Sequence, residues 1–199
     1  MLAAAKGRRA ASGHGYDRRV AGEDVGAEIR TARPSDVAAI AALHLASWRV
    51  AYAGFVSEGF LGSVTLESRL ERWGRALDRS LSPDTETIVA EDGATILGVC
   101  SFGFRRRPPS VSVGEIYSLH VRPDLKRRGL GKLLLDESLH HIALRGCESC
   151  VLWVLRDNAN ARRFYDSQGW SPTGEEMVED RSGWQIPETR YAIPINAPA

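Results

Sequence analysis

The stretch that decides the fold runs Val121-Arg122-Pro123-Asp124-Leu125-Lys126-Arg127-Arg128-Gly129-Leu130-Gly131-Lys132-Leu133-Leu134-Leu135. A strand pattern over residues 115–121 leads into it, and a helical pattern over residues 130–145 follows it. The first amide groups of a helix have no acceptor inside the helix, and the helix dipole adds partial positive charge there. Gly129 and Gly131 let an anion approach the backbone closely. The stretch therefore predicts an anion site, for which phosphate is a common ligand.

Basic side chains reinforce this prediction, because they add full positive charge around the helix start. They are Lys126, Arg127, Arg128 and Lys132. The stretch is not a P-loop, since it lacks the pattern Gly-x-x-x-x-Gly-Lys-Ser/Thr. It also lacks the third glycine of the dinucleotide-binding fingerprint. The alternative interpretation is a tight strand–turn–helix connection with a solvated basic rim.

A second motif lies in residues 158–170, directly after the buried-strand pattern of residues 151–155. Asn158 is a favoured N-cap residue, and Gly169 is a favoured helix stop. Ala161 and Tyr165 are four residues apart, so they share one helix face. The motif predicts a short amphipathic helix that follows a central strand.

With both motifs in this order, residues 27–195 resemble the GCN5-related N-acetyltransferase (GNAT) family. In that family the loop after the fourth strand holds the pyrophosphate of acetyl-CoA, and the later helix lines its thiol end. The resemblance implies an acetyl-CoA site without a metal. Its residues would be Leu119, His120, Val121, Lys126, Arg127, Arg128, Gly129, Leu130, Gly131, Lys132, Asn158, Ala161 and Tyr165. Two positions depart from the pattern: Lys126 stands where Gln or Arg is usual, and Arg127 where glycine is frequent.

The resemblance also implies the catalytic groups. Tyr165 would protonate the departing thiolate, and Glu115 would act as the base for the amine. Backbone amides in residues 119–121 would stabilise the developing oxyanion. Strand alternation predicts that Glu115 shares a face with Leu119 and Val121, and that His120 lies on the other face as a structural residue. The alternatives are that Tyr165 only packs in the core and that Glu115 is a surface residue.

The acceptor is implied to be a primary amine, on a small molecule or a protein. Trp48 and Tyr52 are candidates to line its site, with burial in the core as the alternative. The run Arg105–Arg107 is expected to be a solvated hairpin loop. An alternative function is a catalytically silent acyl-CoA-binding regulatory module. A homodimer is compatible with the family.

The order of predicted elements implies a mixed α/β fold, with a central, mostly antiparallel sheet and helices on both faces. Residues 114–121 and 150–155 flank a helix, so these two strands must be parallel. In the resembled family they are splayed central strands with the cofactor between them. Proline cannot donate to a sheet ladder, so residues 105–109 are predicted to leave the sheet.

The composition of the 199 residues suits one domain, residues 27–195. Residues 1–26 lack apolar periodicity and are predicted to be a flexible N-terminal extension, with an upstream start codon or an organelle transit peptide as the alternatives. The net charge of +1 gives no case for a nucleic-acid partner. No apolar run is long enough to span a membrane, and no secretory signal is evident, so we expect a cytoplasmic protein.

No metal site is predicted. Cys147 and Cys150 have no second pair at ligand spacing, so they are interpreted as an incidental buried pair. His140 and His141 each follow an acidic residue by four positions on one predicted helix. The two acids, Asp136 and Glu137, are expected to form solvated charge pairs.

Overall fold

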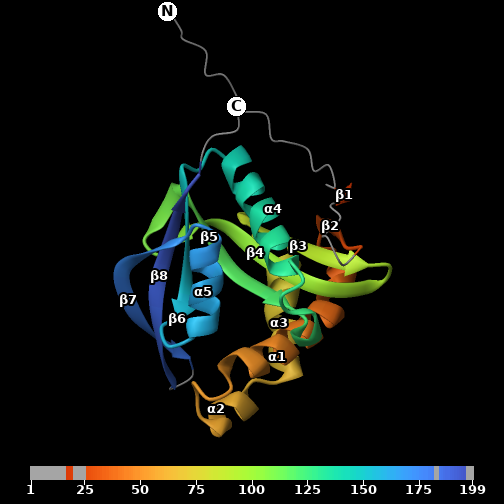
Figure 1. Ribbon diagram of the computed structural model, residues 1–199. Helices are drawn as coiled ribbons and strands as arrows, with labels where there is room; N and C mark the ends of the chain where they lie inside the picture. The colour runs from red at the N-terminus through yellow and green to blue at the C-terminus, as the bar shows by residue number, and fades with distance from the viewer. Residues whose placement is uncertain (1–16, 20–25, 182–183, 196–199) are drawn as a thin grey trace, which may run out of the picture.

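The computed structural model describes residues 17–19, 26–181 and 184–195 and places eight strands in one sheet (Figure 1). The strand order is β1-β2-β3-β4-β5-β6-β8-β7. Only the β5–β6 pair is parallel in this sheet. The strands are β1 (Asp17–Arg19), β2 (Glu28–Thr31), β3 (Thr85–Asp92), β4 (Thr95–Arg106), β5 (Pro109–Val121), β6 (Ser149–Leu155), β7 (Ser171–Arg181) and β8 (Trp184–Pro194).

Helices cover both faces of the sheet (Figure 1). On one face, Cys100 and Ile116 pack with apolar residues of α4 and α5. On the other face, Val89 and Val99 pack with apolar residues of α1 and α3. These two layers confirm the predicted fold class. The helices are η1 (Pro34–Asp36), α1 (Val37–Tyr52), α2 (Glu58–Ser63), α3 (Leu66–Leu77), η2 (Pro123–Leu125), α4 (Leu130–Leu144) and α5 (Ala159–Ser167).

The parallel pair β5 and β6 is joined over only part of its length. Residues 113–116 of β5 pair with residues 149–152 of β6, and the pairing ends there. The rest of β5 keeps its antiparallel partner β4. The predicted splay of the two central strands is therefore confirmed. It leaves one edge of residues 117–121 without a paired strand within the described sheet.

The expectation that residues 105–109 leave the sheet is wrong. β4 continues to Arg106, and β5 begins at Pro109, which pairs with Arg106. Because Pro109 is the first residue of its strand, its missing N–H removes no bond from the strand interior.

Part of the predicted N-terminal extension also belongs to the sheet. Residues 17–19 form β1, which pairs with β2 in antiparallel fashion. The remainder of the prediction for residues 1–26 falls on residues 1–16 and 20–25, which lie outside the described residues, and on Gly26, which precedes β2.

Candidate functional site

The start of α4 presents backbone amides toward one end of the sheet. The first bond of the helix runs from Leu133 N to Gly129 O at 3.0 Å. The amides of residues 130–132 therefore donate to no backbone acceptor in the described chain. Gly129 has φ 80°, a left-handed conformation that favours glycine, and no atom lies within 4 Å of where its Cβ would be. The helix start is thus open, as the sequence predicts for an anion site.

The two glycines of this loop have different roles. A Cβ on Gly131 would lie 3.4 Å from Phe164 Cζ of α5, at the limit of ordinary van der Waals contact, so Gly131 lies against α5 whereas Gly129 faces open space. Leu130 is buried in the core beneath them. Arg127 has φ 67°, which explains in physical terms why glycine suits this position.

The basic side chains before α4 are exposed to solvent. Residues 126–128 make no ion pair within 4.0 Å among the described residues. Lys132 differs, because its Nζ lies 2.6 Å from Asp136 Oδ2 one helical turn later. Three unpaired cations therefore stand beside the open amides, and the fourth is partly neutralised.

The unpaired edge of β5 offers two more amides. Arg122 N donates to Leu97 O of β4 at 2.9 Å. Amide directions alternate along a strand, so the amide of His120 also points toward β4. The amides of Leu119 and Val121 then point the other way, toward the side where β6 has diverged. Of the predicted oxyanion donors, these two have the required direction.

A β-bulge at Tyr117 changes the face of Glu115. Ser101 lies opposite Ser118, but Phe102 lies opposite Ile116, so Tyr117 is an inserted residue. Leu119 and Val121 accordingly share the α4 face with Ile116. Glu115 lies on the opposite face, which α1 and α3 cover. The prediction that Glu115 shares the face of Leu119 and Val121 is wrong, because the inserted residue interrupts the alternation.

Glu115 is half-buried in a neighbourhood rich in arginine. Its Oε2 accepts a hydrogen bond from Arg106 N at 2.8 Å. Burial raises the pKa of the Glu115 carboxyl, while the Arg106 amide and nearby guanidinium groups oppose part of that shift. A carboxylate with a raised pKa is a better proton acceptor, as a general base needs to be.

Asn158 fixes the start of α5. Its Oδ1 accepts from Ala161 N at 3.0 Å, as the N-cap prediction requires. Its Nδ2 lies 3.5 Å from Ala51 O and so links α5 to the end of α1. Ala161 itself packs at the edge of the core beside Phe164. Asn158 and Ala161, both predicted to line the cofactor site, therefore lie at the start of α5, which follows the end of β6.

Tyr165 lies on the core-facing side of α5. Its ring packs near Trp170 and Tyr191, with centroid distances of 6.1 and 6.3 Å. Burial raises the pKa of the Tyr165 hydroxyl, so it keeps its proton at neutral pH. Within residues 26–181 and 184–195, its oxygen has no hydrogen-bond partner. The hydroxyl is thus a proton donor without an assigned acceptor.

The side chain of His120 belongs to a buried polar cluster. Its ring stacks on His44 at a centroid distance of 4.0 Å, and its Nδ1 lies 3.0 Å from Ser47 Oγ. His44 Nδ1 in turn accepts from Trp73 Nε1 at 2.9 Å. Burial lowers the pKa of His120 to about 3, helped by Arg72 and Arg69. The ring therefore stays neutral and has a structural role.

The two predicted acceptor residues have different environments. Trp48 is only 2% exposed and packs against Phe60. Tyr52 stacks on Trp48 at a centroid distance of 4.8 Å and keeps partial exposure. Tyr52 also lies within electrostatic range of Tyr165. Tyr52 is therefore positioned near the candidate acid, and Trp48 supports it from the core.

The charge pairs of α4 differ from those expected. Asp136 pairs with Lys132, and Glu137 is buried rather than solvated. His141 Nε2 lies 3.4 Å from Glu137 Oε1, and its Nδ1 lies 2.8 Å from Glu86 Oε2 of β3. The difference arises because β3 supplies a second carboxylate, which the sequence of α4 alone does not reveal.

Two further properties of the described residues bear on the site. They contain no group of three or more His, Cys, Asp or Glu side chains arranged to hold a metal ion. They also contain no helix long and apolar enough to cross a membrane.

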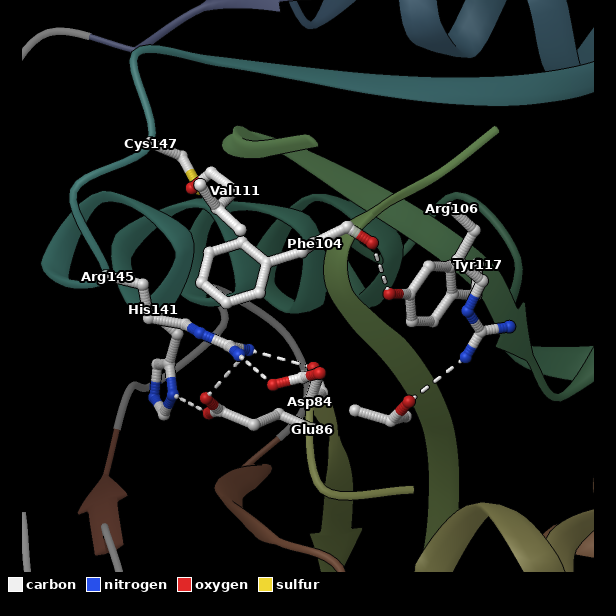
Figure 2. A network of polar contacts seen from close by, with 10 residues as sticks. Asp84, Glu86, Phe104, Arg106, Val111, Tyr117, His141, Arg145 and Cys147 are labelled. Atoms are coloured by element: carbon white, nitrogen blue, oxygen red, sulfur yellow. Dashed lines mark hydrogen bonds and ion pairs between the residues drawn. The ribbon is translucent and has the colours of Figure 1, made fainter. Parts of the chain in front are cut away.

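Arg106 and Tyr117 also belong to the site, although the sequence did not indicate this. The Arg106 guanidinium carbon lies 3.4 Å from the centroid of the Tyr117 ring (Figure 2), and the Arg106 amide donates to Glu115 Oε2. The run Arg105–Arg107 was visible in the sequence. However, only the bulge and the hairpin pairing bring Arg106 over Tyr117.

Comparisons with known proteins agree with this geometry. The family model described as "Acetyltransferase (GNAT) family" matches residues 49–170. The chain is 27% identical over 152 residues to the uncharacterized N-acetyltransferase YuaI of Bacillus subtilis, covering 76% of this chain and 82% of that protein. It is 33% identical over 118 residues to the mycothiol acetyltransferase of Beutenbergia cavernae, covering 59% of this chain but only 38% of that longer protein.

A solved structure shares the fold. The PaiA N-acetyltransferase of Thermoplasma acidophilum, crystallised with coenzyme A, superimposes with a TM-score of 0.65 at 24% sequence identity. The superposition covers 83% of this chain and 98% of that one. At this level of identity the likeness shows the common fold.

Proposed function

The chain belongs to the acetyltransferase (GNAT) family, and from this premise we propose that it transfers an acetyl group from acetyl-CoA directly to a primary amine. The acceptor is a small molecule or a protein. The observation that carries the proposal is the open start of α4 beside the diverging strands β5 and β6, with amides and three cations that have no partner among the described residues. The coenzyme A bound to the related PaiA enzyme supports the same assignment.

The residues around this opening fit acetyl-CoA. The amides of residues 130–132 and the side chains of residues 126–128 would hold its pyrophosphate. Acetyl-CoA supplies the acetyl thioester. Leu119 N and Val121 N would donate to the carbonyl oxygen as its negative charge grows.

Two side chains handle the protons. Glu115, with its raised pKa, would take a proton from the acceptor amine. Tyr165 would give a proton to the departing sulfur, for which its buried, protonated hydroxyl is suited. These steps need no covalent bond between the acetyl group and the protein.

The test is thiol release from acetyl-CoA in the presence of amines, with the acetylated product identified by mass. The proposal predicts release that depends on both protein and amine. Saturable binding of acetyl-CoA without release across a broad amine panel would instead favour a silent regulatory module. The cytoplasmic location and the homodimer stay predictions, to be tested by cell fractionation and sedimentation.

A further inference from the structure

A cavity of about 350 Å³ lies where β3 begins and the β4–β5 hairpin turns. Its polar lining includes Thr85, Arg105, Arg106 and Tyr117. Arg106 connects this cavity to the candidate base, because its backbone amide is the group that binds Glu115. The volume suits a ligand of the size of an amino acid. Glu115 does not line the cavity itself, so Arg106 is the residue that the cavity and the candidate base have in common.

The guanidinium of Arg106 is held in place by two contacts (Figure 2). Its carbon lies 3.4 Å from the centre of the Tyr117 ring, which is a cation–π contact. Its Nη2 donates to Thr85 Oγ1 at 3.0 Å. Tyr117 is itself fixed, because its hydroxyl donates to Phe104 O at 2.6 Å. Arg106 is thus oriented before any ligand arrives.

The guanidinium groups at the cavity act on the Glu115 carboxyl from a distance but form no close ion pair among the described residues. Across the described chain, no Asp or Glu side chain lies within 4.0 Å of the guanidinium groups of residues 105–107. Asp84 also lines the cavity, but its nearest cation is Arg145, at 3.9 Å. Arg106 donates one side-chain hydrogen bond, to Thr85, so most of its donors remain available.

From these contacts we propose that the acceptor is a small amino-carboxylate, whose carboxylate binds Arg106 in the cavity while its amine faces Glu115. This inference rests on the proposed acetyl transfer. A planar guanidinium matches a carboxylate with two parallel hydrogen bonds, which gives orientation as well as attraction.

The test compares the L-amino acids with their carboxamides as acceptors at saturating acetyl-CoA. For the best acceptor, we expect kcat/KM to be higher for the free acid than for its carboxamide. R106Q should reduce this acid-to-carboxamide ratio of kcat/KM about tenfold or more. Comparing this ratio between variants cancels the different basicities of the two amines. R107Q is the matched control, because it removes the same charge from the same hairpin but does not line the cavity. It should leave the ratio unchanged.

Calorimetric binding of the same compounds, in the presence of coenzyme A, separates this inference from the proposed function. Binding of the free acid that R106Q abolishes and R107Q keeps supports the carboxylate site, even if no thiol is released. If the acid-to-carboxamide ratio of kcat/KM is the same in wild type and R106Q, the carboxylate site is overturned. The proposed acetyltransferase function would still stand, because turnover was observed. Failure of every free acid to bind the wild-type protein overturns it as well.

Discussion

At the scale of single residues, Tyr165 and Glu115 divide the proton transfers of the proposed reaction. They lie on different elements, α5 and β5, and burial raises the pKa of both side chains. For Tyr165 the shift keeps the proton on the donor, whereas for Glu115 it strengthens the base. The same physical cause therefore suits both roles.

Replacing Tyr165 with Phe removes only the candidate donor. We expect kcat to fall about 100-fold, as for the loss of a general acid, and the Kd for acetyl-CoA to stay within about twofold because the ring remains. Y191F is the matched control, since it deletes a hydroxyl from the neighbouring ring, which accepts a hydrogen bond from Arg162. An equal kcat for Y165F and wild type would remove Tyr165 from the acid role.

Replacing Glu115 with Gln tests the base through the pH profile. In the wild type, log kcat/KM should rise as pH passes the raised pKa of Glu115, above its ordinary 4.5, because only the carboxylate accepts the proton. E115Q should lose this rise, and the control E71Q, an exposed position on α3, should keep it. An unchanged profile in E115Q would exclude Glu115 as the base.

At the scale of elements, the start of α4 gathers amides and cations that belong to consecutive residues. This arrangement is local, so the spacing of Gly129 and Gly131 is enough to predict it. The face of the sheet on which Glu115 lies is not determined by neighbouring residues alone. It depends on the extra residue Tyr117, which shows only when β5 is paired with β4.

Reversing the charge of Arg128 tests the anion site at the start of α4. R128E should weaken acetyl-CoA binding about tenfold, because a carboxylate would face the pyrophosphate. Added salt should reduce the difference in Kd between R128E and the wild type, because salt screens this repulsion. The control R75E changes an exposed arginine on α3, on the opposite face of the sheet. Equal Kd values for R128E and R75E by calorimetry would place the cofactor elsewhere.

The contact between α4 and β3 has a pH dependence of its own. The hydrogen bond to Glu86 raises the pKa of His141 above 6.5, although burial opposes the shift. The charged form of His141 is thus favoured in the folded protein. Its contribution to stability is fully present below the pKa that His141 has in the unfolded chain, and it is lost as the pH rises through the higher pKa of the folded protein.

We therefore expect H141Q to lower the free energy of unfolding by about 1 kcal/mol near pH 5.5 and by less near pH 9, measured by urea denaturation. Figure 2 shows the two side chains facing each other. The control is H140Q, which changes the adjacent, exposed histidine and leaves the pair of His141 with Glu86 in place. If H141Q lowers the free energy of unfolding equally at the two pH values, the His141–Glu86 pair is not the source of the pH dependence.

At the scale of the whole molecule, the sequence predicted the mixed sheet, the helices on both faces and the splayed parallel pair. The mixed sheet, the helices on both faces and the parallel pair follow from the order and periodicity of the elements, whereas the splay of that pair was implied by the resemblance to the GNAT family. The burial of Glu137 and the position of Arg106 over Tyr117 could not be predicted. The burial of Glu137 accompanies contacts between α4 and β3, which are far apart in the chain, and Arg106 reaches Tyr117 only through the bulge and the hairpin pairing.

Hydrogen exchange with and without acetyl-CoA tests most directly whether the cofactor lies between the diverging strands. The amides of residues 130–132, together with Leu119 and Val121, have no backbone acceptor in the described chain and would gain one on binding. We predict that acetyl-CoA slows exchange at these positions, while the cavity at the β4–β5 hairpin is unaffected. Binding that protects other segments and leaves these amides unchanged would contradict the proposed cofactor site.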